Sequence, residues 1–431
     1  MSDELAFEVS LDRPRIPTSN KETELKCLVN LWPESELRED NAAQLETSLC
    51  LVFDCSASML GEKLETAIES AKMIVDTLHE SQRISLIAFQ SSIHLLVDNA
   101  RATDLEKDAI KQQIEEIRSL AGGSTNLTGG IKEGVRTLQR GDTDAQVMII
   151  LSDGAADFPE TAEKAAADAT DKGVQLFAVG IGADYEADHL LKLVTPSNGT
   201  VFGESDAEMI KMTFSNLIGR IENFCATNVR LDVTFPADVQ AGLAYKTSPE
   251  QAFVGNMAPD ADRNVQFNVG NLENNKIYSF LLLVTAPARE EGEFEICKAR
   301  VTYSVPSMGI EDATREIEVR VEYSSDRKQT EEIDGEVMEV FRRASITQLA
   351  ERFVDAYKDG NDPQQTAKYL QILIRRYDEI GDAAMKNHYE SLLNELTDGG
   401  ELTQEMLNTA VVASTVVAGG GELPHVLDDN F

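Results

Sequence analysis

The stretch "LVFDCSASML", residues 51–60, joins an apolar run to a polar one. Leu51, Val52 and Phe53 are followed directly by Asp54, and two serines come two and four residues later. A continuous apolar run is typical of a strand that is covered on both faces. The sequence therefore predicts that a buried strand ends at Asp54 and that the next loop presents a carboxylate and two hydroxyls.

Three similar apolar runs follow, at residues 84–89, 147–151 and 174–180. Between them, apolar side chains recur every three or four residues, which makes one buried stripe on a helix. Strands that alternate with helices predict a doubly wound, mostly parallel α/β sheet of Rossmann-like type over residues 46–222. The first helix is expected around residues 64–78, and the others near residues 104–119, 127–139, 160–171 and 205–222.

The flanks of this α/β region contain expected strands without helices between them. The segment "REIEVRVEY", residues 315–323, alternates charged and apolar residues, as a half-exposed strand of an antiparallel sheet does. Neither flank closes a sandwich by itself, so we expect residues 1–45 and 223–325 to form one antiparallel β-sandwich into which the α/β domain is inserted. The other expected strands are 4–12, 22–32, 227–235, 264–269, 277–285 and 293–304.

The chain becomes helical after residues 324–329, which we interpret as a polar linker. Gly- and Pro-containing turns separate the expected helices, which predicts a C-terminal helical bundle over residues 330–418. The apolar run at 410–418 is shorter than the roughly 18 residues of a membrane span and is expected in a buried helix. Residues 419–431 are Gly-rich and then acidic, as in a flexible tail. The expected helices are 332–358, 363–379, 382–396 and 403–417.

The composition limits the classes of partner. The chain has 75 Asp and Glu residues against 39 Lys and Arg, a formal net charge of -36. Such an acidic chain repels phosphate backbones and anionic membranes, which argues against nucleic acid as a ligand. The five cysteines form no C-x-x-C pair and suit a reducing compartment. With neither a secretory signal at the start nor a membrane span, we expect a cytoplasmic protein.

Oxygen side chains gather in three expected loops. Ligands of an open α/β sheet bind beyond the carboxyl ends of its strands. Asp54, Ser56 and Ser58 follow the first strand, Asp153 follows the run at 147–151, and Thr125 lies in "AGGSTNLTGG". An isolated Asp at a strand end is usually a helix cap or a turn residue. Together, however, hydroxyls and carboxylates are hard ligands that suit Mg²⁺ or Mn²⁺.

This combination resembles the von Willebrand factor A family with its metal-ion-dependent adhesion site. The resemblance covers about residues 46–222 and places the five motif positions of the family on Asp54, Ser56, Ser58, Thr125 and Asp153. In the family, the two serines and, in the open state, the threonine ligate the metal directly, while the aspartates act mainly through water. Two departures are mild: Ala57 stands where Gly is frequent, and Cys55, outside the coordinating set, is expected to face the core.

The resemblance implies a metal-dependent protein–protein interaction. Ligation by neutral hydroxyls leaves a Mg²⁺ ion, or Mn²⁺ or Ca²⁺, only partly neutralised, so an Asp or Glu of a partner protein would complete its shell. The order of domains resembles that of bacterial cytosolic proteins with this domain. Some of these work beside AAA+ ATPases of the MoxR type, so an adaptor subunit for a partner ATPase or for a protein-modifying or defence system is the alternative.

Enzyme classes fit the sequence less well. It has neither a phosphate-binding G-x-x-x-x-G-K-[ST] loop nor a G-x-S-x-G nucleophile motif. A phosphotransferase that used Asp54 would need a second Asp two residues later, where Ser56 stands. We therefore expect a binding module rather than an enzyme, with a vestigial metal site as the remaining alternative. No histidine lies in the expected site loops, and surface or capping positions are expected for His79, His94, His189, His388 and His425.

Overall fold

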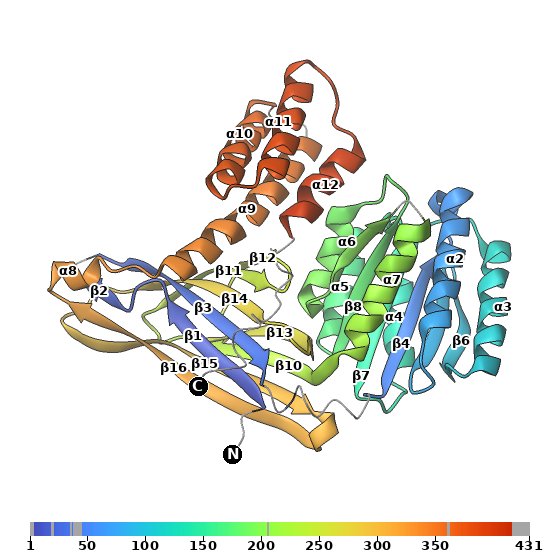
Figure 1. Ribbon diagram of the computed structural model, residues 1–431, viewed down its shortest axis with the longest axis horizontal. Coiled ribbons are helices and arrows are strands. Elements are labelled where there is room, and N and C mark those ends of the chain that lie inside the picture. The colour runs from blue at the N-terminus through green and yellow to red at the C-terminus, as the bar shows by residue number, and fades with distance from the viewer. Residues whose placement is uncertain are drawn as a thin grey trace.

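The computed structural model describes residues 4–18, 21–34, 37, 45–204, 207–359 and 363–415. Figure 1 shows three units: an α/β unit, a β-sandwich and a group of helices that stands over the junction of the other two. The expected fold class is confirmed, because a mostly parallel sheet, two sheets whose strands are antiparallel except for the pair β2 and β16, and C-terminal helices are all present. The expected tail, residues 419–431, lies outside the described residues.

A six-stranded sheet forms the centre of the α/β unit. Its order is β6-β5-β4-β7-β8-β9, and all neighbours are parallel except β5 and β6. Every residue of β4 is buried, in agreement with its apolar sequence. The strands are β4 (Thr47–Asp54), β5 (Arg83–Phe89), β6 (Ile93–Arg101), β7 (Ala145–Ser152), β8 (Val174–Ile181) and β9 (Val201–Glu204).

Helices cover both faces of this sheet (Figure 1). Side chains of β4 alternate between the faces: Leu51 and Phe53 pack in one apolar cluster, and Val52 packs in another. The first cluster includes α2 (Glu62–Thr77), α3 (Asp104–Leu120) and α7 (Ala207–Glu222). The second includes α4 (Leu127–Leu138), α5 (Pro159–Thr170) and α6 (Ala187–Val194).

The β-sandwich combines strands from both ends of the α/β unit. β3 pairs with β14, and β2 pairs with β16, so both sheets contain N-terminal and later strands. Apolar side chains of the two sheets share one core. One sheet has the order β1 (Leu5–Leu11), β3 (Thr23–Pro33), β14 (Tyr278–Ala286), β11 (Gln240–Ser248) and β12 (Ala252–Asn256). The other has the order β13 (Asn264–Glu273), β10 (Phe224–Thr234), β15 (Gly292–Val305), β16 (Ile310–Ser324) and β2 (Arg15–Pro17).

The C-terminal helices begin on the sandwich. The first turns of α9 pack Val337 and Ala344 against Tyr245 and its apolar neighbours, and later turns pack Phe353 among the following helices. The expected linker at 324–329 is wrong, since β16 reaches Ser324 and Asp326 caps a short helix directly after it. The helices are α8 (Arg327–Thr330), α9 (Gly335–Lys358), α10 (Pro363–Glu379), α11 (Ala383–Thr397) and α12 (Gln404–Ser414).

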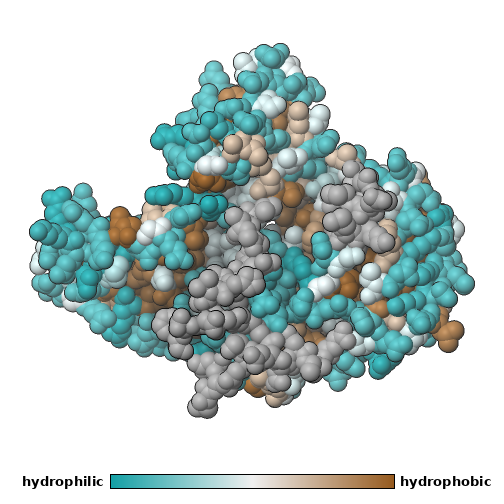
Figure 2. All heavy atoms as spheres, in the orientation of Figure 1, coloured by the Kyte–Doolittle hydropathy of each residue, from teal (hydrophilic) through white to brown (hydrophobic). Residues whose placement is uncertain are grey.

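The surface agrees with the acidic composition. Figure 2 shows a mostly hydrophilic face, with apolar side chains visible below the group of C-terminal helices. None of the helices in the described ranges is long and apolar enough to cross a membrane. The five cysteines are free and buried.

Candidate metal centre

Asp54 lies at the carboxyl end of β4 with no exposed surface. Its Oδ1 accepts a hydrogen bond from the backbone N–H of Ser56 at 2.9 Å, and its Oδ2 accepts one from the Ser152 hydroxyl at 2.7 Å. Burial raises the pKa of Asp54 to about 6, against the lowering effect of these hydrogen bonds, and the charge of Asp153 adds to the rise. The carboxylate is thus held in place but is short of positive charge.

The two serine hydroxyls lie beside each other. Ser56 is buried, Ser58 is exposed, and their Oγ atoms are 3.2 Å apart. A short 3₁₀ helix, η1 (Ala57–Met59), starts directly after Ser56 and turns the chain so that both hydroxyls stay on one side of the loop. Two adjacent hydroxyls at the edge of a buried site are within reach of one small cation.

Backbone hydrogen bonds join the loops that carry the five predicted residues. Ala57 N–H donates to Gly123 O at 3.0 Å, and Gly122 N–H donates to Cys55 O at 2.8 Å. These two bonds hold the serine loop against the loop of Thr125, while the bond from Ser152 to Asp54 joins the β4 and β7 loops. Thr125 and Asp153 are both buried. The structure therefore brings together three loops that are far apart in the sequence.

The donor set fits a hard divalent cation. In the part of the chain that the structure describes, no group of three or more His, Cys, Asp or Glu residues could hold a metal. A cation at these loops would therefore depend on serine and threonine hydroxyls together with Asp54 and Asp153. Oxygen ligands of this kind favour Mg²⁺ over soft metals such as Zn²⁺.

The family model of the von Willebrand factor type A domain matches residues 48–216. This stretch is a von Willebrand factor type A domain. The A domain thus contains the six-stranded sheet and all five predicted site residues.

Relatives of known sequence are longer than the region they share with this chain. An uncharacterized protein of Synechocystis sp. is 26% identical over 278 residues, which cover 63% of this chain and 64% of that protein. Inter-alpha-trypsin inhibitor heavy chain H2 of Homo sapiens is 25% identical over 194 residues, which cover 42% of this chain and 20% of that protein. The chain spans less than two thirds of either relative.

Solved structures show the same overall arrangement. A von Willebrand factor type A protein from Catenulispora acidiphila has a TM-score of 0.80 at 17% identity and covers 96% of this chain and 97% of its own. The ArnB paralog VWA2 from Sulfolobus acidocaldarius has a TM-score of 0.60 at 16% identity. The match covers 97% of this chain and 99% of that protein's chain. At these identities the likeness concerns the fold, which extends beyond the A domain to the sandwich and the helices.

Lys63 is a neighbour of the site that the motif did not reveal. Its Nζ lies 3.2 Å from Asp153 Oδ2 and 2.8 Å from Asp184 Oδ1. Burial lowers the pKa of Lys63, but its bonds to Asp184 and Asp153 outweigh this effect and raise that pKa above its ordinary value. An ammonium group of the A domain therefore already neutralises part of one predicted metal-site carboxylate.

His189 also contacts the site loops, so its expected surface or capping position is wrong. It lies on α6, is buried, and its Nδ1 donates to Gly154 O at 2.6 Å. The Glu186 N–H, at the start of the same helix, donates to Asp153 O at 2.7 Å. These bonds position the loop of Asp153. No helix was predicted at 187–194, so local patterns did not place His189 beside the loop of Asp153.

Cys55 faces the core, as expected. It is buried in the apolar cluster beneath α2, and its Sγ donates to Phe89 O at 3.3 Å. Burial raises the pKa of the Cys55 thiol to about 12, and the neighbouring Asp54 adds to the rise. The thiol therefore stays protonated at neutral pH and is a poor metal ligand.

Proposed function

We propose that the A domain is a metal-dependent protein-binding module. Ser56 and Ser58 would hold a Mg²⁺ ion directly, joined by Thr125 in an open state, with Asp54 and Asp153 acting through water. An Asp or Glu of a partner protein would fill the remaining position. The observation that carries the proposal is Asp54, a buried carboxylate that lies beside two adjacent hydroxyls and pairs with no cationic side chain among the residues that the structure describes.

Charge explains why such a module would need the metal. At a formal net charge of -36, the protein repels an acidic partner at long range. A divalent ion held mainly by neutral hydroxyls keeps enough positive charge to attract one carboxylate at short range. Proteins with an A domain are mostly interaction modules, which supports binding rather than catalysis. Mn²⁺ or Ca²⁺ would use the same oxygen ligands and would also attract the partner's carboxylate.

A calorimetric titration tests the metal site. The wild-type protein is expected to bind one Mg²⁺ ion, and Asp54→Ala is expected to bind it at least about tenfold more weakly, because the variant lacks the central buried carboxylate. Asp144→Ala is the matched control. Asp144 accepts a hydrogen bond from the backbone N–H of Glu46 and lies at the opposite end of the sheet. Equal titrations of wild type and Asp54→Ala would contradict the proposal.

Affinity capture tests the partner. Wild-type protein with Mg²⁺ is expected to retain a protein that is released by a chelator and that Asp54→Ala does not retain. An ATPase or a protein-modifying enzyme among the retained proteins would favour the adaptor role. A partner that binds equally well to Asp54→Ala and in the presence of chelator would show that binding does not use this site.

Lys63→Met is expected to tighten Mg²⁺ binding about threefold to tenfold. The substitution removes the ammonium group from Asp153 and leaves that carboxylate free to act on a metal-bound water. Lys72→Met is the control, because Lys72 lies on the same helix and pairs with Glu69 and Glu115 instead. The measurement is the same titration, and weaker binding by Lys63→Met would show that Lys63 supports the metal rather than competes with it.

A further inference from the structure

A cavity of about 570 Å³ lies where the three units meet. Its walls come from α6 and η2 (Thr195–Ser197) of the A domain, from β12 and β13 of the sandwich, and from α9 and α12. It contains none of the five predicted metal-site residues. Sites for small organic molecules typically have about 300–1,000 Å³ and often lie between domains.

Aromatic side chains line the inner side of this cavity. Phe267 and Phe280 belong to the core between the two sheets, with ring centroids 5.4 Å apart, and Phe253 lies on β12. β12 and β13 are end strands of their sheets, so the cavity reaches the open side of the sandwich. Val254, at 45% exposure, lies at its mouth. An apolar group could therefore pack against the rings without opening the core.

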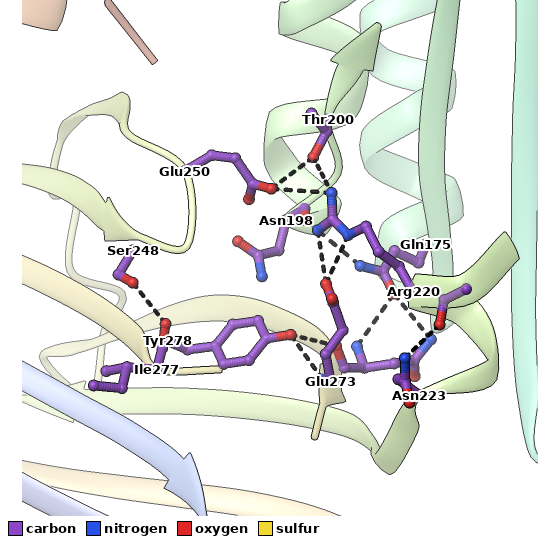
Figure 3. A network of polar contacts seen from close by, with 12 residues as sticks. Gln175, Asn198, Thr200, Arg220, Asn223, Ser248, Glu250, Glu273, Ile277 and Tyr278 are labelled. Atoms are coloured by element: carbon purple, nitrogen blue, oxygen red, sulfur yellow. Dashed lines mark hydrogen bonds and ion pairs between the residues drawn. The ribbon is translucent and has the colours of Figure 1, made fainter. Parts of the chain in front are cut away.

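Asn198 lies on the wall of this cavity with its side-chain amide buried and unpaired. The residue is 2% exposed, and neither Oδ1 nor Nδ2 has a hydrogen-bond partner among the described residues. In Figure 3 the side-chain amide of Asn198 points away from Arg220 and the residues that Arg220 contacts. A buried polar group without a partner destabilises a protein by about 1–3 kcal/mol. The unpaired amide of Asn198 therefore lowers the stability of the protein at the cavity wall.

The charges of the cavity are unbalanced. Lys246 pairs with Glu250, and Asp188 pairs with Lys358. Four other charged residues line the cavity and form no ion pair within the described ranges. They are one base, Lys192, and three acids, Glu163, Glu351 and Asp355.

Two of these acids repel each other. Glu351 and Asp355 lie one turn apart on α9, where like charges destabilise the helix. Burial raises the pKa of Glu351 to about 7, and the charge of Asp355 adds to the rise, while Lys192 acts in the opposite direction. The cavity therefore has a position at which a positive charge would be stabilised.

We propose that this cavity binds a small organic cation with an apolar body. Its ammonium group would lie at Glu351 and Asp355, and its apolar body would pack on Phe253, Phe267 and Phe280, where aromatic faces also attract a cation. The site is independent of the proposed metal centre.

Three probes that share a phenyl group but differ in charge test whether the cavity prefers a cation. We would titrate the full chain, with chelator present, with phenethylamine, 2-phenylethanol and 3-phenylpropionate and measure binding by calorimetry and thermal unfolding. Phenethylamine is expected to bind at least about tenfold more tightly than the alcohol, and the carboxylate is expected not to bind. Equal affinity for the three probes, or binding of none of them, would overturn the proposal.

Three variants locate the site. Glu351→Gln is expected to weaken phenethylamine binding about tenfold, whereas Glu339→Gln, a surface change on the same helix, should leave it unchanged. Val254→Trp should abolish binding by filling the mouth of the cavity. Asn198→Gly suits the backbone φ of 61° and removes the unpaired amide, so the ligand-free protein should melt higher. Unchanged binding by both Glu351→Gln and Val254→Trp would place the cation elsewhere and contradict the assignment.

Discussion

Arg220→Met is expected to lower the free energy of unfolding by about 3–5 kcal/mol. Arg220 lies in the last turn of α7, with its side chain 19% exposed. Its guanidinium is 2.7 Å from Glu273 Oε1 and 3.0 Å from Glu250 Oε1, both on the sandwich side of the junction (Figure 3). Methionine keeps much of the side-chain volume but leaves Glu273 without this cation and Glu250 with Lys246 alone. Chemical denaturation of both proteins at pH 7 measures the difference.

Arg136→Met is the matched control for this substitution. Arg136 is an exposed arginine that pairs with Glu133 on its own helix, so its loss should change stability by less than about 0.5 kcal/mol. If Arg220→Met were as mild as Arg136→Met, the ion pairs at the junction would contribute little to holding the A domain on the sandwich. Apolar contacts and hydrogen bonds of uncharged groups, such as that from Asn271 to Gln175, would then hold the two units together.

Glu250→Gln is expected to destabilise the protein by about 3 kcal/mol at pH 7 and by only about 1 kcal/mol at pH 3. Burial raises the pKa of Glu250, but the charges of Lys246 and Arg220 outweigh burial and hold that pKa at about 2. Because this value is below that of the unfolded chain, the stabilising contribution is complete above about pH 4.5. It decreases as the pH falls from 4.5 toward 2, because the carboxylate of the unfolded chain takes up a proton over this range while the native carboxylate stays charged.

Denaturation curves of wild type and Glu250→Gln between pH 7 and pH 3 measure this dependence. The difference in stability should shrink steadily with falling pH. Glu339→Gln is the control, because Glu339 pairs with Arg343 at the surface and its loss should have a small effect throughout. A difference that stays constant down to pH 3 would mean that Glu250 does not carry a buried charge in the native protein.

Local patterns predicted the centre of the A domain well. The apolar run that ends at Asp54 is a buried central strand, and the three oxygen-bearing loops do lie at one edge of the sheet. The prediction missed β6 because its residues are mostly half-buried and partly polar. It missed α6 because an apolar segment of eight residues is too short to be told from a buried strand by its pattern. β11 and β12 also went unpredicted, since both are rich in small and polar residues.

Contacts between segments that are distant in the sequence were beyond local patterns. Lys63 meets Asp153 from 90 residues away, and Arg220 meets Glu273 from 53. The two residues of each pair are not spaced as in a known sequence motif. They come together only because of the way in which the helices and the sandwich pack in the folded protein. The unpaired amide of Asn198 depends on the same docking. The domain boundaries at 46–222, 223–325 and 330–418, and metal ligation by the five site residues, remain predictions.

The pairing of β3 with β14 has a consequence for synthesis of the chain. Leu28 lies opposite Leu281, so the two halves of this sheet leave the ribosome about 250 residues apart. At about 5–20 residues per second, that interval is roughly 12–50 seconds. The A domain can complete its own sheet during this time, while β1 and β3 wait with an unpaired edge and an uncovered apolar face. The nascent protein therefore carries an aggregation-prone pair of strands until β14 emerges.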